Sequence, residues 1–360
     1  MKIVAAAYLH GFGGAEKQLI MLCNQMVERN HDVTMVLIAG DDIAYPLDKR
    51  VKIISLLFAE SRSRFVSILK RTIHLRKVLL ELSADVIINF NMQSACMLSL
   101  INKSKIGKVI YCERGDPGDD EYSGLLGLIR KITFPRIDGF VFQTFGARDY
   151  FNDSNILAKS TVIPNPCFLQ NQIRFTGEKI KKIVTIGRLH PQKNQSLLIK
   201  AFASIREQIP NYILQIYGDG ELKESLISLA KELNVDQYVH FMGNSKSVLQ
   251  EIKDASLFVL SSDFEGIPNV LIEAMAIGLP CISTDCKPGG ARLLIQNGRN
   301  GLITAIGDEK ALGQAMIRIL RDEDYANTLG KNAMEISNTL SPKNIYDKWE
   351  NFFFNIIQNR

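Results

Sequence analysis

Short runs of β-branched and other apolar residues alternate with helical patterns along nearly the whole chain, and this alternation constrains the fold more than any other feature. Strands of a parallel sheet are buried on both faces, and each is followed by a helix that returns the chain, so such alternation is typical of α/β proteins. A length of 360 residues is too long for one ordinary core and suits two domains. We therefore predict two parallel sheets covered by helices.

The predicted strands form two series. The first comprises residues 2–8, 32–38, 52–55, 85–90, 108–112, 139–143 and 161–163, and the second comprises residues 182–186, 212–217, 239–242, 257–260, 280–283 and 301–303. Helical periodicity fills the segments between them, for example residues 15–29, 65–82, 94–102, 124–131, 147–151, 195–208, 221–233 and 268–277.

The segment 163–166 (IPNP) separates the two series. Two prolines that frame an asparagine exclude helix and favour extended or turn backbone. We place the domain boundary there, which gives an N-terminal Rossmann-like domain of residues 1–165 and a C-terminal one of residues 166–340. Residues 341–360 are predicted to form one amphipathic helix, and its aromatic side chains need a surface to bury against: Trp349, Phe352 and Phe353.

Composition excludes several classes of protein. No window of about 18 residues is apolar throughout, so we expect no membrane span, and the first apolar run meets His10 and Gly11 too early for a signal peptide. A net charge of +5 is too weak to indicate nucleic-acid binding. None of the six cysteines forms a C-x-x-C pair, and the five histidines lack metal-ligand spacing. This pattern favours reduced core thiols in a cytoplasmic protein, without a metal site.

Two glycine-rich loops join strands to helices. Residues 11–17 (GFGGAEK) follow the first strand, and glycines there expose amides at a helix N-terminus, where the dipole favours an anion. The segment lacks the G-x-G-x-x-G spacing of a dinucleotide site, so a tight turn remains the alternative. Residues 284–292 (TDCKPGGAR) form the second loop, for which a phosphate site and a tight turn are equally open.

Arg188 and Lys193 lie five residues apart in the loop 187–194 (GRLHPQKN), which ends at a helix start that Asn194 is placed to cap. Two cations and helix amides suit a diphosphate, with arginine as a planar fork and lysine as a point charge. The loop follows the carboxyl end of a parallel strand, where open α/β sheets bind ligands. A solvated basic loop is the alternative.

The most informative segment is 261–276 (SSDFEGIPNVLIEAMA), which follows an apolar strand. Pro268 suits the first turn of a helix, so Glu265 precedes this helix in a glycine-containing loop and Glu273 lies inside it. One carboxylate and free amides would then lie at the mouth of a site, with the second carboxylate about 8 Å deeper by helical rise. Carboxylates accept hydrogen bonds from vicinal sugar hydroxyls. A surface glutamate and an ordinary helical glutamate are the alternative.

With these segments in this order, the chain resembles glycosyltransferase family 4, whose members are retaining enzymes of the GT-B fold. The resemblance spans nearly the whole chain and is strongest from Gly187 to Ile303. It is carried by GGAE (13–16), IPNP (163–166), GRL and QKN (187–194), YGDG (217–220) and FMGN (241–244), and above all by Glu265-x7-Glu273 with its GIPN insert. It implies an α/β fold of two Rossmann-like domains with an interdomain cleft, and a C-terminal helix that returns to the N-terminal domain.

The resemblance also implies a role for each matching position. Arg188 and Lys193 would neutralise the donor diphosphate and Glu265 would hold the donor sugar, so these three residues are the catalytic candidates. The implied donor-binding residues are Gly13, Gly14, Gly218, Asn244, Gly266, Ile267, Asn269 and Glu273. The donor would be a UDP-sugar, with no cofactor and no metal required because the two cations supply the countercharge.

The chain departs from the family pattern at two positions. Members often carry a histidine near the donor sugar where this chain has Arg114, to which we assign a contact with the sugar or the acceptor. A general base is left unassigned. The glycine-rich loop usually continues to a glutamate where this chain has Leu293.

We predict transfer of a hexosyl unit, with retention, from a UDP-sugar to a glycan acceptor in bacterial surface polysaccharide synthesis. The segment 113–117 (ERGDP) and the strand 139–144 resemble transferases that act on lipid-diphosphate-linked saccharides at the inner membrane face. A UDP-sugar 2-epimerase of the same fold and a non-catalytic nucleotide-sugar-binding protein are the alternatives.

Two segments indicate contact with a membrane. Residues 61–80 hold six basic and no acidic residues among helically spaced apolar ones, and residues 125–131 repeat this mixture. Basic residues near an anionic bilayer each contribute about 1 kcal/mol to binding. We therefore expect the N-terminal domain to bind an anionic membrane surface peripherally, with a merely solvated basic face as the alternative.

Overall fold

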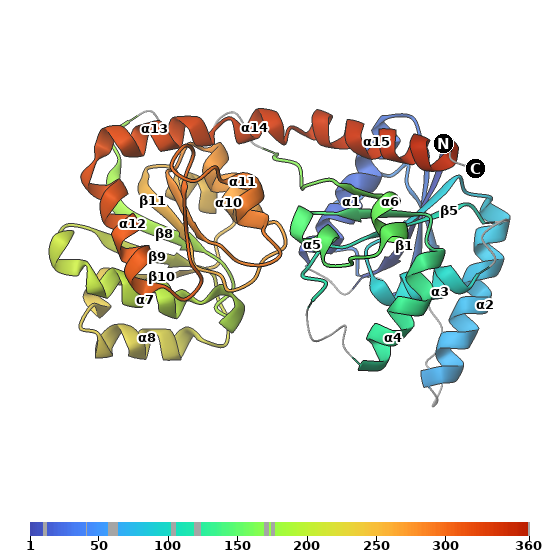
Figure 1. Ribbon diagram of the computed structural model, residues 1–360, viewed down its shortest axis with the longest axis horizontal. Helices are drawn as coiled ribbons and strands as arrows, with labels where there is room; N and C mark the ends of the chain where they lie inside the picture. The colour runs from blue at the N-terminus through green and yellow to red at the C-terminus, as the bar shows by residue number, and fades with distance from the viewer. Residues whose placement is uncertain are drawn as a thin grey trace. The chain divides into compact units, whose positions relative to one another are not determined.

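The computed structural model describes residues 1–9, 13–40, 42–56, 64–101, 106–118, 124–168, 173 and 177–358. The chain divides into two compact units (Figure 1). Unit 1 comprises Met1–Pro164 and Lys343–Arg360, and unit 2 comprises Asn165–Pro342. The sequence analysis placed these breaks after residues 165 and 340.

Unit 1 is built on a seven-stranded sheet with the strand order β3-β2-β1-β4-β5-β6-β7. All of its pairings are parallel. The strands are β1 (Lys2–Tyr8), β2 (Asp32–Ala39), β3 (Lys52–Ser55), β4 (Val86–Asn89), β5 (Lys108–Cys112), β6 (Gly139–Phe142) and β7 (Ser160–Val162). Each strand predicted in the first half of the sequence overlaps one of these, so the parallel α/β prediction is confirmed for this unit.

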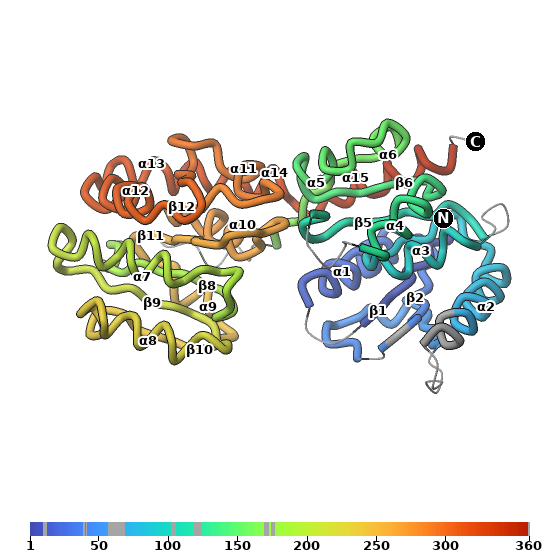
Figure 2. Tube along the Cα trace, turned by 60° about the horizontal axis from the view of Figure 1, so that its bottom comes forward, coloured from blue at the N-terminus to red at the C-terminus, as the bar shows by residue number. Residues whose placement is uncertain are grey.

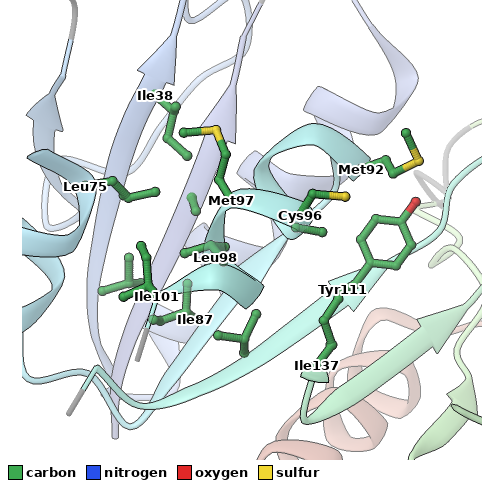
Figure 3. Packing of buried hydrophobic residues seen from close by; sticks show 14 of the residues in the cluster. Ile38, Leu75, Ile87, Met92, Cys96, Met97, Leu98, Ile101, Tyr111 and Ile137 are labelled. Atoms are coloured by element: carbon green, nitrogen blue, oxygen red, sulfur yellow. The ribbon is translucent and has the colours of Figure 1, made fainter. Parts of the chain in front are cut away.

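The helices of unit 1 are α1 (Gly14–Glu28), α2 (Arg64–Leu82), α3 (Met92–Leu100), α4 (Gly124–Thr133), α5 (Phe145–Asp149) and α6 (Ser154–Ala158). Helices α2 and α3 bury apolar side chains against one face of the sheet, and Figure 3 shows part of this cluster, which includes Leu75 of α2, Met97 of α3 and Ile87 of β4. Polar residues set the helix starts. Asn91 caps α3 by accepting from the Ser94 amide at 3.1 Å, which satisfies a donor that the first helical turn leaves unpaired.

Unit 2 has a six-stranded sheet of order β10-β9-β8-β11-β12-β13, also parallel throughout. Its strands are β8 (Ile180–Ile186), β9 (Ile213–Tyr217), β10 (Val239–Gly243), β11 (Ala255–Leu260), β12 (Cys281–Thr284) and β13 (Leu302–Thr304). Its helices are α7 (Gln195–Ser204), α8 (Lys223–Glu232), α9 (Val248–Ile252), α10 (Asn269–Ala276), α11 (Gly290–Leu294), α12 (Glu309–Arg321), α13 (Glu323–Ala333) and α14 (Ile336–Thr339). The path from strand to helix to strand can be followed along the tube in Figure 2.

The strand order of each sheet reverses at its first strand. In unit 2, β8 lies between β9 and β11, so successive connections leave β8 in opposite directions. Adjacent loops part at such a switch point, and the gap beyond the carboxyl ends of the strands is where open α/β sheets bind ligands. The loops that follow β8 and β11 are therefore the expected ligand-binding loops of unit 2.

The last helix, α15 (Pro342–Gln358), packs in unit 1. Its Trp349 and Phe353 are buried, and Phe352 approaches the glycine at which β6 begins. Arg29, just after α1, forms ion pairs with Asp347 at 2.7 Å and Glu350 at 2.9 Å, so the end of α1 is tied to α15. The aromatic side chains that the sequence left without a partner are thus covered by unit 1.

The six cysteines are all buried and none forms a disulfide, as the sequence predicts: Cys23, Cys96, Cys112, Cys167, Cys281 and Cys286. Burial raises the pKa of the Cys23 and Cys112 thiols to about 12, because a thiolate loses its hydration in an apolar interior. These thiols therefore serve as small packing groups.

Phe353 and its neighbour Phe354 offer a matched test of α15, because the first is fully buried and the second is 43% exposed. We expect Phe353→Ala to destabilise unit 1 by about 3 to 5 kcal/mol, the usual cost of emptying a buried aromatic site. Phe354→Ala should change stability far less. Urea unfolding of the full chain, followed by circular dichroism, measures both. Equal midpoints for the two variants would contradict the packing of α15.

Candidate active site

The loops after β8 and β11 lie side by side, because the two strands are neighbours and run parallel. The first loop begins at Gly187 and contains a short 3₁₀ helix, Pro191–Lys193. It ends at Asn194, whose side chain accepts from the Leu197 amide at 3.1 Å and caps α7 as predicted. The second loop runs from Ser261 to Pro268. The fold therefore brings the two cations and the first carboxylate of the sequence pattern to one edge of one sheet.

A set of hydrogen bonds ties these two loops together. The Asp263 amide donates to the Gln192 carbonyl at 2.9 Å, and the Gln192 side-chain amide donates to the Phe264 carbonyl at 2.9 Å. Asn194 donates from Nδ2 to Asp263 Oδ1 at 2.8 Å. Because main chain and side chains both take part, the two loops hold a defined mutual position rather than moving independently.

At the centre of this arrangement, Lys193 Nζ forms an ion pair with Glu265 Oε1. The side chains of Lys193 and Glu265 are only 18% and 10% exposed, so solvent screens the pair weakly. The lysine chain extends past Gly187, where an added Cβ would come within 3.2 Å of Lys193 Cδ. Removing one partner of such a pair leaves a partly buried charge uncompensated. This loss lowers the stability of the fold by more than a surface ion pair contributes to it.

The glycine-rich loop after β12 supports the loop that carries Glu265. A Cβ on Gly290 would lie 1.8 Å from the Gly266 carbonyl oxygen, so only glycine permits this approach. The Glu265 amide donates to the Lys287 carbonyl at 2.9 Å. The second loop of the sequence analysis is thus a packing element of the site. A contact of this loop with phosphate stays a prediction.

The loop after β9 packs against the Arg188 segment. Gly218 has φ +128°, a conformation that L side chains rarely adopt, and an added Cβ would lie 2.1 Å from the Gly187 carbonyl oxygen. The Leu189 amide donates to the Asp219 carbonyl at 3.0 Å, and the Gly218 amide donates to the Gly243 carbonyl at 2.8 Å. This places Asn244, which is exposed at the end of β10, on the same edge of the sheet.

Helix α10 carries the second carboxylate of the pattern. It begins at Asn269, and Pro268 is its N-cap with φ −75° and ψ 104°. The expectation that Pro268 lies in the first helical turn is therefore wrong by one residue. Pro268 is packed close to the glycine-rich loop, since a Cβ added at Gly290 would lie 3.1 Å from Pro268 Cδ. Glu273 lies inside the helix, as predicted. It shares a partly exposed face with Asn269, one turn earlier.

Comparison with known proteins identifies the chain. A family model described as "Glycosyltransferase Family 4" matches residues 12–170, and one described as "Glycosyl transferases group 1" matches residues 170–336. This chain is a family 4 glycosyltransferase. The two models meet at residue 170, close to the division between the units.

The similarity of this glycosyltransferase to its relatives extends over nearly its full length. It is 28% identical to the GalNAc-alpha-(1->4)-GalNAc-alpha-(1->3)-diNAcBac-PP-undecaprenol alpha-1,4-N-acetyl-D-galactosaminyltransferase of Campylobacter jejuni, over 94% of both chains. It is 23% identical to the amylovoran biosynthesis glycosyltransferase AmsD of Erwinia amylovora, over 94% of this chain and 95% of that one.

Solved structures show the same fold. The lipopolysaccharide outer core galactosyltransferase WaaB, in its apo form, superposes with a TM-score of 0.82 at 20% identity, over 99% of both chains. Anabaena HepE in complex with UDP gives a TM-score of 0.83 at 18% identity, over 99% of this chain and 100% of that one. The predicted GT-B fold class is thereby confirmed.

The other predicted site residues of this glycosyltransferase do not take part in the Lys193–Glu265 pair. Gly13 and Gly14 lie in unit 1 at the start of α1, where the Gly13 amide donates to Glu16 Oε2 at 3.2 Å. Gly11 lies outside the described residues. Arg188 is exposed, and no hydrogen bond or ion pair engages its guanidinium within the described part of the chain. Its charge is therefore open to a ligand, whereas that of Lys193 is shared with Glu265.

Arg114 has a different environment in unit 1. Its guanidinium lies over the Phe90 ring at 4.0 Å from the centroid and over the Trp349 ring of α15 at 5.5 Å. Burial lowers the pKa of Arg114. The neighbouring Glu113 is buried and accepts from the Tyr111 hydroxyl at 2.8 Å. The contact with sugar or acceptor that the sequence assigned to Arg114 stays a prediction, and the structure adds a packing role beside it.

Sequence reasoning missed the polar residues that hold the site in place, of which Ser262 and Thr284 are the most buried. In the sequence, only their positions directly after β11 and at the end of β12 could have indicated this role. In the part of the chain that the structure describes, no three His, Cys, Asp or Glu side chains group as metal ligands.

Gly218 and Gly298 form a matched pair for testing the packing of these loops. Both have positive φ, +128° and +81°, but only a Cβ at Gly218 would meet other atoms within 4 Å. We expect Gly298→Ala to cost about 1 to 2 kcal/mol of backbone strain, and Gly218→Ala to cost more because the Gly187 loop must move. Thermal unfolding measures both. If Gly218→Ala is no more destabilising than Gly298→Ala, the close approach does not exist.

Proposed function

We propose that this glycosyltransferase moves a hexosyl unit, with retention at the anomeric carbon, from a UDP-sugar to a lipid-diphosphate-linked saccharide in bacterial surface polysaccharide synthesis. The observation that carries the proposal is the Lys193–Glu265 pair beside the exposed Arg188, at the carboxyl edge of the sheet of unit 2. The Campylobacter jejuni relative, whose name states a diphospho-undecaprenol-linked acceptor, and the UDP complex of HepE support the choice of substrates.

The chemistry needs positive charge where the leaving diphosphate develops its own negative charge. Fixed cations in a partly desolvated site stabilise such a group more than mobile solvent does. Arg188 presents a planar fork to the phosphate oxygens. Lys193 has three N–H donors, so it keeps donors for a phosphate while it contacts Glu265. Because these cations supply the countercharge, we propose that transfer requires neither a metal nor a cofactor.

The two glutamates would bind different parts of the donor. Glu265, next to the amides of Gly266 and Ile267, would accept hydrogen bonds from hydroxyls of the donor sugar. Glu273, one turn beyond Asn269 on the open face of α10, would accept from the ribose hydroxyls. Gly218 and the backbone near Asn244 would adjoin the base. The contact with the diphosphate that the resemblance implies for Gly13 and Gly14 stays a prediction. In this proposal unit 1 binds the acceptor.

A panel of UDP-sugars tests the function and the role of the cations together. We expect one donor of UDP-glucose, UDP-galactose, UDP-N-acetylglucosamine and UDP-N-acetylgalactosamine to be hydrolysed slowly to free sugar and UDP, with or without EDTA. Arg188→Ala and Lys193→Ala should each lower this turnover about 10²-fold, because each removes a charge facing the leaving group. Lys231→Ala, at an exposed position in the last turn of α8, is the control and should match the wild type.

The other outcomes favour the alternatives or remove a role. An isomerised UDP-sugar would indicate the 2-epimerase, and binding without any turnover would indicate a non-catalytic nucleotide-sugar-binding protein. If a folded Arg188 or Lys193 variant retains wild-type turnover, that residue does not contact the diphosphate. Loss of turnover in EDTA that Mg²⁺ restores would contradict the metal-independent mechanism.

We further propose that the protein acts peripherally at the cytoplasmic face of the membrane, with unit 1 on the lipid. No helix within the described residues is long and apolar enough to cross a bilayer. Helix α4 exposes several large apolar side chains: Leu125, Leu126, Leu128 and Ile132. Helix α2, on the same face of the sheet, buries Leu75 and Leu79 but exposes Leu69 and Ile73.

Basic residues accompany these apolar ones. Lys70, Arg76 and Lys77 are exposed on α2, and Lys131 is exposed on α4. Arg71 differs, since its side chain hydrogen-bonds Tyr8, and Arg62 lies outside the described residues. Mixed apolar and basic surface of this kind favours an anionic lipid interface.

Vesicle sedimentation tests the membrane proposal. The protein should bind anionic vesicles at low salt, bind less at high salt, and bind little to neutral vesicles, because screening weakens the attraction. Replacing Lys70, Arg76 and Lys77 together by Gln should weaken binding several-fold. The control replaces three exposed lysines of unit 2 by Gln, Lys181, Lys231 and Lys310, for the same change in net charge. Equal loss in both triple variants, or no binding at all, would contradict a membrane face on unit 1.

A further inference from the structure

Two fully buried hydroxyl groups lie behind Glu265 and have no part in the proposed chemistry. Ser262 follows β11, Thr284 ends β12, and neither side chain is exposed to solvent. A buried hydroxyl costs free energy unless it is hydrogen-bonded. Neither residue reaches a ligand from this position, so their effect on a ligand must pass through the groups they hold.

The Ser262 hydroxyl donates to Glu265 Oε1 at 2.9 Å. Lys193 Nζ contacts the same carboxylate oxygen. The Ser262 main chain is fixed in turn, because Thr284 Oγ1 donates to its carbonyl oxygen at 2.5 Å. Thr284, Ser262 and Glu265 thus form a chain of hydrogen bonds from the end of β12 to the carboxylate.

This chain leaves the two carboxylate oxygens in different states. Oε1 receives two donors, whereas no described residue donates to Oε2, which is not enclosed by protein. The terminal torsion of a glutamate is soft and roughly two-fold, so a lysine contact alone would allow the carboxylate to turn. A second donor from a different direction fixes the plane of the carboxylate. Oε2 then remains the carboxylate oxygen that can accept from a ligand.

We propose that Ser262 is a positioning residue, which holds the Glu265 carboxylate so that Oε2 accepts a hydrogen bond from a hydroxyl of the donor sugar. Thr284 supports this role by fixing the Ser262 carbonyl. The inference rests on the proposed function, because it requires Glu265 to contact the sugar. It predicts that Ser262 affects binding of the sugar part of the donor and leaves binding of the nucleotide part unchanged.

Calorimetric titration of the full chain with UDP, and with whichever UDP-sugar of the panel binds most tightly, separates these two parts. A hydrogen bond to a charged group is worth about 1.5 to 3 kcal/mol, so Ser262→Ala should weaken binding of the UDP-sugar about 10-fold or more. Binding of UDP should change less than about two-fold. In the Glu265→Ala background, adding Ser262→Ala should weaken the UDP-sugar no further, because the group that Ser262 holds is absent.

Matched variants control for a general loss of structure. Thr284→Val removes the hydroxyl with little change of shape and should weaken the UDP-sugar, whereas Thr284→Ser keeps the hydroxyl and should not. Ser256 lies on β11, at the end of the strand opposite to Ser262, and donates to the Ile180 carbonyl at 2.8 Å, so Ser256→Ala should leave both affinities unchanged. If Ser262→Ala does not fold, the Thr284 pair tests the same chain of hydrogen bonds.

The remaining outcomes contradict either the positioning role of Ser262 or the proposed function. Equal weakening of UDP and UDP-sugar by Ser262→Ala, or an undiminished effect in the Glu265→Ala background, overturns the positioning role while the proposed function stands. A Ser262→Ala variant with wild-type affinities does the same. If Glu265→Ala leaves the UDP-sugar affinity unchanged, or the wild type binds neither ligand, the proposed function itself fails and the inference fails with it.

Discussion

The partly buried ion pair between Lys193 and Glu265 is the contact on which the site depends. It forms because β8 and β11 are neighbouring parallel strands, so the loops at their carboxyl ends meet. The pair holds two opposite charges at one point, each available to a different part of a nucleotide-sugar. Lysine can face the diphosphate and glutamate the sugar, and the two charges compensate each other through their ion pair. An isolated charge in such a place would cost stability.

The glycines around the pair explain how the loops come so close. At Gly218 and Gly290 the backbone of one loop lies where a side chain of the other would be. Glycine is needed at these positions for the close packing of the loops. The same packing would also determine where their amides could contact a phosphate. The same segment therefore satisfies both interpretations of a glycine-rich loop, the tight turn and the anion site, and the sequence alone could not separate them.

Much of the fold was predictable from the sequence, because strands buried on both faces leave continuous apolar runs such as those within Lys2–Tyr8 and Lys108–Cys112. The pairing of Lys193 with Glu265 was not, since the residues are 72 positions apart and no local pattern encodes the neighbour of a strand. Ser262 was missed for a related reason, because a buried serine has no distinctive spacing. Arg114 was read as a site residue from its position, and only the fold showed Phe90 and Trp349 beneath its guanidinium.

Hydrogen exchange with and without saturating UDP, resolved by mass spectrometry of the full chain, tests the central claim that the carboxyl edge of unit 2 binds the nucleotide diphosphate. The account predicts protection in residues 187–194, 217–220 and 263–267, where amides and charges converge, and in 287–290, which supports them. Peptides at the opposite edge of the same sheet, such as 178–182 and 277–280, should exchange unchanged. Protection at that opposite edge, or no protection at 187–194 and 263–267 when UDP is bound, would contradict it.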